Sequence, residues 1–325
     1  MSQDKIIARI ARVLAEGDAV EGLALSLPAT DLQSLMLHVY GERGARRTPA
    51  ELLEQYERRA MVRPSSVDVR QLLEVERVAF EQATAFEAMD LSPVAPLGIN
   101  AVLGQIDQNN CLATVRSAEV LADPTTAQAL ECARRRRAGE TGTIKLCARS
   151  KQLRLQPFDN PNFSPHFNIF SLVTAGRDRG SLVFELESLR EHLGTYLAFL
   201  RRLGTMGFHI ASVDISVSDT AGDEGRLERA RVEVLEPLAA EYPQATLHID
   251  RTREQGRNYY SGLCLRLDAF NREGTRINLA DGGFTTWTQR LLSNAKERLL
   301  VSGMGIELLV KLFRQAGGGV PGKPV

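Results

Sequence analysis

The chain has 325 residues, enough to bury a sizeable core either as one large α/β unit or as a core domain with a smaller appendage. Lysine plus arginine and aspartate plus glutamate both number 40, so the formal net charge is zero and no global field favours nucleic acid as a partner. No apolar run approaches the roughly 20 residues that cross a bilayer, and the N-terminus lacks a continuous apolar signal core. We therefore expect a cytoplasmic protein with no membrane partner.

The first 62 residues are predicted to form a small N-terminal helical module. Apolar residues recur at helical spacing between Ile6 and Leu14, and Thr48-Pro49 opens a further helix with proline at an early helical position. A long helix is expected over 67–84, where Ser65 precedes Asp68 by three residues in the pattern of a capping box. An extended segment follows and ends at a proline, Pro93 or Pro96.

Strands and helices alternate through the rest of the chain. Extended segments are expected at 111–121, 143–150, 166–176, 209–219, 245–250, 263–270 and 277–283, and helices at 127–137, 184–203, 224–240 and 285–297. The turn-rich "FDNPNFSP" joins two of the extended segments and suits an antiparallel hairpin. The predicted fold class is therefore α/β of the α+β kind, a mainly antiparallel sheet flanked by helices over residues 66–315. Residues 316–325 are expected to be disordered.

The hairpin carries the first group of candidate site residues. Strand alternation places Arg154 and Gln156 on one face, and Phe167 lies just across the turn. A cation, an amide and an aromatic ring in one place could bind the phosphate, the purine edge and the base of a nucleotide. The alternative is an ordinary hairpin with one charged face.

A second group lies in "TVRSAEVLADPTT", where a strand passes through a turn into a helix that Thr125 or Thr126 could cap. Arg116 and Glu119 at the end of the strand could bind the carboxylate and ammonium of an amino acid, or could neutralise each other in a salt bridge. The four cysteines, 111, 132, 147 and 264, are scattered, with no CxxC pair and no histidine at ligand spacing. We expect reduced, structural thiols and no structural metal.

The stretch "REQGRNYYSG" supplies the third group. Two glycines bracket Tyr259 and Tyr260, and alternating leucines then indicate a strand with one buried face. A strand entered through Gly256 sends the two adjacent tyrosines to opposite faces, so we expect one ring to contact a ligand and the other to pack beneath it. Tyrosines at a strand entrance also commonly serve packing alone. The Gly282-Gly283 step allows close backbone approach to a ligand, or only a tight bend.

In their order along the chain these segments resemble the catalytic domain of histidyl-tRNA synthetase, a class II aminoacyl-tRNA synthetase. "TVRSAEVLADPT" resembles the family's Leu-Arg-Pro-Glu-x-Thr segment, "LRLQ" through "HFNIF" resembles motif 2, and "QGRNYYSG" resembles Arg-Gly-Leu-Asp-Tyr-Tyr-Thr-Gly. "ADGGFTTW" is similar to the Gly-Gly-Arg-Tyr-Asp strand and "SGMGIELL" to motif 3. The resemblance implies ATP with Mg as a cofactor at Arg154, Gln156 and Phe167. It also implies an amino-acid pocket, lined by Arg116, Glu119, Gln255, Tyr259, Tyr260, Gly282 and Gly283.

The sequence also departs from that family. Gln156 replaces the motif 2 glutamate, Gln255 the catalytic arginine, Asn258 an aspartate, and Leu308 the motif 3 arginine. Losing the two arginines removes much of the charge that would hold the phosphates of ATP. No length remains after residue 316 for the family's anticodon-binding domain, so tRNA is not expected as a partner.

Two functions follow from this pattern. The first is a synthetase paralogue that binds a small molecule, such as an amino acid, and regulates a partner enzyme, as the regulatory subunit of ATP phosphoribosyltransferase does. The second is an ATP-dependent ligase that adenylates an amino acid or related acid for an acceptor other than tRNA. The family's motif 1 builds a dimer interface, so the resemblance implies a homodimer through the helix 67–84 and the segment after it.

Overall fold

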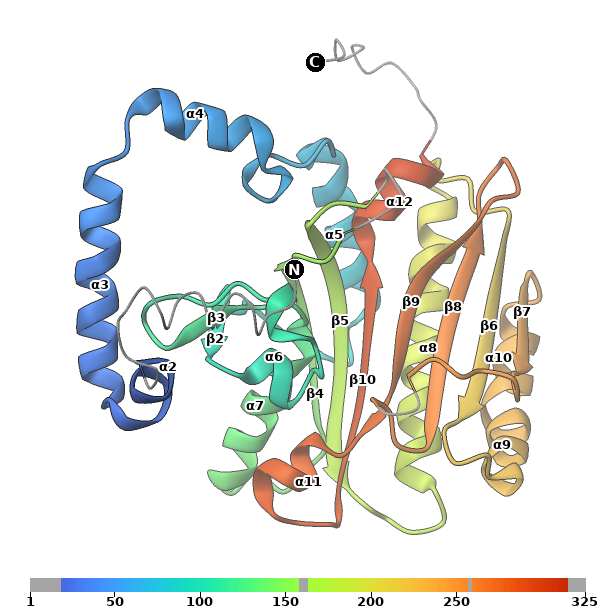
Figure 1. The fold of residues 1–325 in the computed structure, drawn as a ribbon. Coiled ribbons are helices and arrows are strands. Elements are labelled where there is room, and N and C mark those ends of the chain that lie inside the picture. The colour runs from blue at the N-terminus through green and yellow to red at the C-terminus, as the bar shows by residue number, and fades with distance from the viewer. Residues whose placement is uncertain (1–18, 158–162, 257–258, 315–325) are drawn as a thin grey trace.

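A computed structural model describes residues 19–157, 163–256 and 259–314. An eight-stranded sheet forms its centre, in the order β1-β4-β5-β10-β9-β8-β6-β7 (Figure 1). The strands are β1 (Glu87–Met89), β4 (Ile144–Leu153), β5 (His166–Arg177), β6 (Ser212–Asp219), β7 (Ala245–Ile249), β8 (Leu263–Phe270), β9 (Arg276–Thr285) and β10 (Glu297–Gly305). Only the edge pairs β1–β4 and β6–β7 are parallel. The predicted fold class, a mainly antiparallel sheet flanked by helices, is confirmed.

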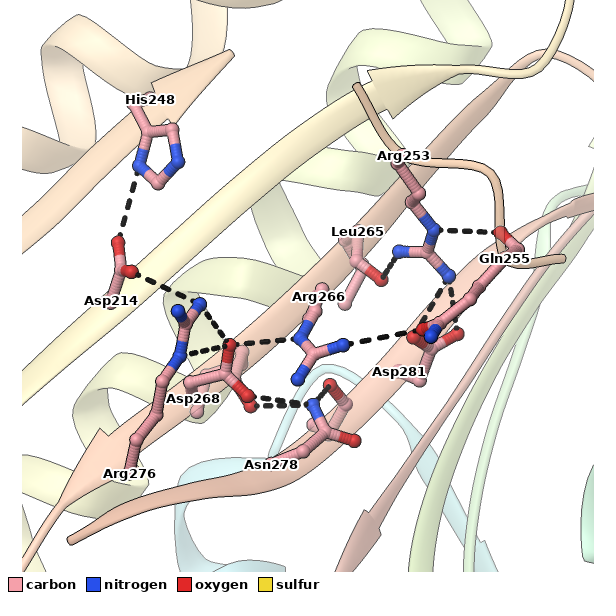
Figure 2. A network of polar contacts seen from close by, with 12 residues as sticks. Asp214, His248, Arg253, Gln255, Leu265, Arg266, Asp268, Arg276, Asn278 and Asp281 are labelled. Atoms are coloured by element: carbon pink, nitrogen blue, oxygen red, sulfur yellow. Dashed lines mark hydrogen bonds and ion pairs between the residues drawn. The ribbon is translucent and has the colours of Figure 1, made fainter. Parts of the chain in front are cut away.

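Helices cover both faces of this sheet. One face packs under the long α8 (Val183–Gly204) and under α5 (Val69–Gln82), α9 (Glu224–Ala230), α10 (Glu236–Glu241) and α12 (Ile306–Phe313). The other face packs under α6 (Ile99–Val102), α7 (Pro124–Arg137) and α11 (Trp287–Leu292), beside β4, β5 and β10. The remaining strands of that second face, β9, β8 and β6, carry polar side chains (Figure 2), and no helix of the described residues lies over them in Figure 1. The four cysteines are buried and unpaired.

Two predicted segments were wrong in extent. Of 111–121, only β3 (Ala118–Val120) is a strand; it pairs with β2 (Val94–Pro96) in a separate two-stranded sheet, and Ala113 before it forms an isolated bridge to Glu119. The predicted helix 285–297 is only the short α11, because Ser293 adopts a left-handed conformation (φ 49°) and Glu297 already begins β10. Its pairing with β5 and β9 makes β10 a central strand, so tertiary pairing overrides the local pattern.

The helix caps also differ from those expected. α5 is capped by Asp68, whose side chain accepts a hydrogen bond from the Arg70 N–H, while the Ser65 hydroxyl donates to Glu307 instead. α7 is capped by Asp123, not by Thr125 or Thr126, and Pro124 occupies its first turn. At both helices the aspartate is the residue directly before the first turn, where its carboxylate can accept from a free N–H group.

Residues 19–62, called the arm from here on, form helices that stand away from the rest of the chain (Figure 1). They are α2 (Ala19–Glu21), η1 (Gly22–Ser26), α3 (Ala29–Ala45), α4 (Pro49–Arg58) and η2 (Ala60–Val62). Thr48 and Glu51 form a capping box at the start of α4, with Pro49 in its first turn as predicted. Neither α3 nor α4 buries a residue. The predicted helix around Ile6–Leu14 and the tail 316–325 lie outside the described residues. Nowhere in the described ranges is a helix both long and apolar enough to cross a membrane.

Candidate functional site

A cavity of about 470 Å³ lies beside the uncovered part of the sheet. Its walls come from the first residues of β5, from β9 and β10, from the N-terminus of α7, and from α12. A volume of this size falls within the range typical of small-molecule sites. The lining is partly apolar, with Ile169, Leu279 and Val301, and partly charged, so a ligand would meet both kinds of surface.

Tyr259 and Tyr260 both line this cavity. Their rings pack edge to face with centroids 4.8 Å apart, and each hydroxyl donates to a carboxylate: Tyr259 to Asp123 at 2.9 Å and Tyr260 to Asp281 at 2.6 Å. The expectation that they point to opposite faces is wrong, because β8 begins only at Leu263 and the tyrosines precede it, outside regular strand geometry. Both rings are therefore wall residues.

Gly282 and Gly283 on β9 do not line the cavity, and Gly283 lies beneath the ring of Tyr260. A Cβ atom at Gly283 would lie 2.7 Å from ring atoms of Tyr260, and one at Gly282 would lie 2.5 Å from Cβ of Ser302. Both distances are shorter than real Cβ contacts. Gly283 therefore allows the Tyr260 ring to pack directly on the strand, and Gly282 allows close packing of β9 against Ser302 of β10.

The carboxylate that Tyr259 binds is that of Asp123, which was not predicted as a site residue. Glu119 is fully buried and accepts hydrogen bonds from the Asn100 N–H (2.7 Å) and from Nε2 of Gln108 (3.0 Å). Arg116 is exposed in a turn, and neither residue lines the cavity. The signal for Asp123 was the Asp-Pro step, which indicates a helix cap whose carboxylate lies at the N-terminal end of α7.

Arg154 and Phe167 are brought together as predicted. The Arg154 guanidinium carbon lies 5.5 Å from the centroid of the Phe167 ring, its Nε donates to the carbonyl of Ala122 (2.8 Å), and both side chains line the cavity. The β4–β5 hairpin produces this proximity, since Gln152 pairs with Phe167 and Arg154 follows the end of β4. Gln156 lies in a bend beyond that end and does not line the cavity.

A cation close to Gln255 comes from Arg253 (Figure 2). Gln255 is exposed, and its side chain accepts a weak hydrogen bond from Arg266 (3.4 Å). The Arg253 guanidinium instead binds both oxygens of Asp281, at 3.0 and 2.9 Å, and lies 5.7 Å from the Tyr260 ring centroid. Burial raises the pKa of Asp281, and the charge of Arg253 opposes that rise. Although Gln255 stands where the family has an arginine, the guanidinium of Arg253 keeps a positive charge beside the tyrosines.

The polar contacts continue from Arg253 through Gln255 to Arg266, across the uncovered sheet face. Figure 2 shows Arg266 and Arg276 converging on Asp268, whose Oδ2 they contact at 2.8 and 2.7 Å, and Arg276 also reaching Asp214. Three aspartates and three arginines alternate in this network. Its charges compensate one another, so it stabilises the open face without creating a field over it.

Glu307 and Lys311 of α12 form the opposite wall. Glu307 accepts hydrogen bonds from Asn168 (2.5 Å) and Ser65 (3.1 Å), and Nζ of Lys311 lies 3.7 Å from it. Lys311 lines the cavity one helical turn beyond Leu308. Its ammonium therefore places a positive charge on α12, although Leu308 replaces the arginine of motif 3. Within the described ranges no cluster of three or more His, Cys, Asp or Glu could hold a metal ion. Since Glu307 is already engaged by Asn168, Ser65 and Lys311, it is a poor fit for Mg.

We compared the sequence and the fold with those of known proteins. A scan against protein-family models gives no match, and a search of curated proteins gives none either. Among solved structures, apo S. aureus histidyl-tRNA synthetase matches with a TM-score of 0.58 at 17% identity, covering 78% of this chain and 68% of that one. A Bacillus halodurans protein described as an ATP phosphoribosyltransferase regulatory subunit/histidyl-tRNA synthetase matches with a TM-score of 0.57 at 12% identity, covering 78% and 82%.

A third match is a histidine–tRNA ligase subunit from Alicyclobacillus acidocaldarius, with a TM-score of 0.54 at 12% identity over 78% of this chain and 96% of that one. At these identities the likeness establishes the fold and not the activity. The chain thus has the fold of class II synthetases, and its cavity is built from the segments in which the sequence resembled that family.

Proposed function

We propose that this protein binds a small zwitterionic molecule, such as an amino acid, together with or joined to a nucleotide, and acts as a regulatory paralogue of histidyl-tRNA synthetase. One observation carries the proposal: Asp123 and Arg154 line the same cavity, and among the described residues neither forms an ion pair. A ligand with an ammonium and an anionic group would give each of these side chains the ion-pair partner that it lacks among the described residues.

The nucleotide part of the proposal is supported by Phe167 beside Arg154. A base stacked on the exposed face of this ring would place its phosphate near the guanidinium, which prefers phosphate geometry. The wall formed by Tyr259 and Tyr260 would hold the amino-acid part, with Asp123 facing its ammonium. A homodimer, a partner enzyme and a cytoplasmic location belong to the same proposal.

Calorimetry with ATP, AMP and a panel of amino acids tests this directly. We expect Arg154→Ala to weaken nucleotide binding about tenfold to hundredfold, because a charge-assisted contact typically contributes on the order of 1.5–3 kcal/mol. Asp123→Asn should weaken amino-acid binding and leave nucleotide binding unchanged. Arg116→Ala is the matched control, since that arginine is exposed and lies off the cavity. Unchanged binding in Arg154→Ala would remove the nucleotide assignment.

A second function is favoured by a specific observation. Lys311 lines the cavity and Arg253 lies behind Tyr260, so the site retains cations despite Gln255 and Leu308. These charges support the alternative of a ligase that adenylates an amino acid or related acid for a non-tRNA acceptor. ATP–pyrophosphate exchange separates the two functions: exchange that depends on one amino acid and is lost in Lys311→Met indicates the ligase. Binding without exchange indicates the regulatory protein.

A further inference from the structure

Exposed apolar side chains are unevenly distributed over this chain. Among the described residues, fifteen large hydrophobic side chains are exposed, and thirteen of them lie between Leu25 and Val102. Phe163 and Val232 are the other two. Scattered single residues of this kind are normal on a protein surface, but their concentration in the first third of the chain indicates an interaction surface.

Part of this surface is the arm. Leu52, Leu53 and Tyr40 are each more than half exposed, at 55%, 58% and 57%, although they lie on well-formed helices. α3 and α4 contribute no residue to either core of the chain. Most helical stability in proteins comes from packing one apolar face, so helices that pack nothing in the single chain are expected to pack on something else.

The other part lies on the body of the protein, in α5 and in the β2–α6 region. α5 buries one face, with Val75 and Val78 fully enclosed, yet Val69 and Leu73 four residues apart on its other face are 60% and 53% exposed. Leu97 and Val102, beside β2 and α6, are 54% and 59% exposed. The body therefore offers an apolar surface that the arm of the same chain does not cover.

Charge narrows the choice of partner for the arm. Residues 19–62 contain five arginines and six acidic residues, so the arm has no basic face for nucleic acid or an anionic membrane. Its complement is another apolar protein surface, and one such surface is present in the same sequence. In a two-fold symmetric pair each arm covers the body of the other copy, so both surfaces are satisfied at once. Each copy contributes both an arm, in which α3 and α4 comprise 17 and 10 residues, and a body surface, so one side of the pair can reach the roughly 20–30 residues of a standard interface.

We propose that two copies of this chain exchange their arms, with α3 and α4 of one copy packed on α5 and the β2–α6 region of the other. The arrangement is independent of what the cavity binds, and loss of ligand binding would not affect it. It differs from a dimer in which the bodies meet and the arms remain uncovered.

Sedimentation of the full chain tests the association. Leu52→Ser with Leu53→Ser changes the arm, Val69→Ser with Leu73→Ser changes the body, and Val232→Ser, 44% exposed outside both regions, is the control. None of these side chains is buried, so folding should be retained, which circular dichroism checks. We expect each double variant to raise the dimer dissociation constant at least tenfold and the control to leave it unchanged. A monomeric wild-type chain, or a dimer that is insensitive to the arm variant, would overturn the proposal.

Crosslinking distinguishes exchange from packing within one chain. A photoreactive phenylalanine analogue is placed at Leu53 in ¹⁵N-labelled protein, which is mixed with unlabelled protein and allowed to equilibrate. Exchange predicts crosslinks between the labelled arm and unlabelled peptides within residues 69–102. Crosslinks confined to chains of one label, or to peptides elsewhere in the sequence, contradict it.

Discussion

Arg253 is the residue whose removal should disturb the cavity wall most directly. Its side chain is 8% exposed and binds Asp281, which also accepts the hydroxyl of Tyr260. Arg253→Met leaves a carboxylate without its cation, and since the Asp281 side chain is 38% exposed we expect a loss of about 2 kcal/mol, below the range for fully buried pairs. Urea unfolding of the wild type and of Arg253→Met measures this loss of unfolding free energy. The control is Arg251→Met, an exposed pair with Glu224 whose loss should have no measurable effect; equal losses in both variants would contradict the argument.

His192 should make stability depend on pH. It is fully buried, its ring nitrogens contact Thr174 (3.0 Å) and Ser302 (2.8 Å), and burial lowers its pKa to about 3. The unfolded chain binds this proton near pH 6.5, so its contribution is full above that pH and declines from pH 6.5 towards 3. Between pH 6.5 and 5 the loss should be roughly 2 kcal/mol.

The measurement is the unfolding free energy of wild type and His192→Gln between pH 7.5 and 5. In the variant, the unfolding free energy should depend less steeply on pH, by the amount that the uptake of one proton on unfolding contributes. This difference in slope does not depend on the stability of the variant at neutral pH. His38→Gln on the exposed arm is the control and should keep the slope. If His192→Gln and wild type have parallel profiles, the histidine is not buried in its neutral form.

At the scale of elements, β9 determines where the tyrosines lie. Because a Cβ atom at Gly283 would lie 2.7 Å from the Tyr260 ring and 2.8 Å from Cβ of Cys264, Gly283→Ala must displace the ring. We expect a loss of about 1–3 kcal/mol, as for other overpacked sites, with weaker ligand binding. Gly142→Ala, where a Cβ meets nothing within 4 Å, is the control for unfolding and calorimetry. A Gly283→Ala protein that unfolds and binds like wild type would show that the ring rests elsewhere.

The elements also show what the sequence could predict. The β4–β5 hairpin was predictable because its alternation and its turn lie within one short stretch, and with it came the contact of Arg154 and Phe167. β10 was misread in part because one of its two neighbours in the sheet, β5, is distant in sequence. Asp123 was missed because its position in the cavity depends on Tyr259, 136 residues away. Local sequence patterns therefore predict helices and strands. Which side chains contact one another depends on pairing between segments that are distant in sequence.

At the scale of the whole molecule, the arm and the body should be separable. α3 and α4 bury no residue, whereas Ser65, just beyond the arm, donates to Glu307 in the cavity wall, and the Arg63 carbonyl contacts Nε2 of His166 at 2.6 Å. A chain lacking residues 1–62 keeps both contacts. We therefore expect it to fold and to bind nucleotide with an affinity within about twofold of the full chain, because every residue that lines the cavity is retained.

The fluorescence of Trp287 shows whether the cavity wall keeps its structure in the shortened chain. Trp287 is the single tryptophan of the sequence and is 2% exposed, and its ring packs edge to face on that of Tyr259 with centroids 5.5 Å apart. The shortened chain should show the same blue-shifted emission and one cooperative unfolding transition. Its dimer should be weaker than that of the full chain, since the exchanged contacts are gone. Red-shifted emission in the shortened chain at neutral pH would mean that the arm supports the cavity, because solvent would then reach the wall behind Tyr259.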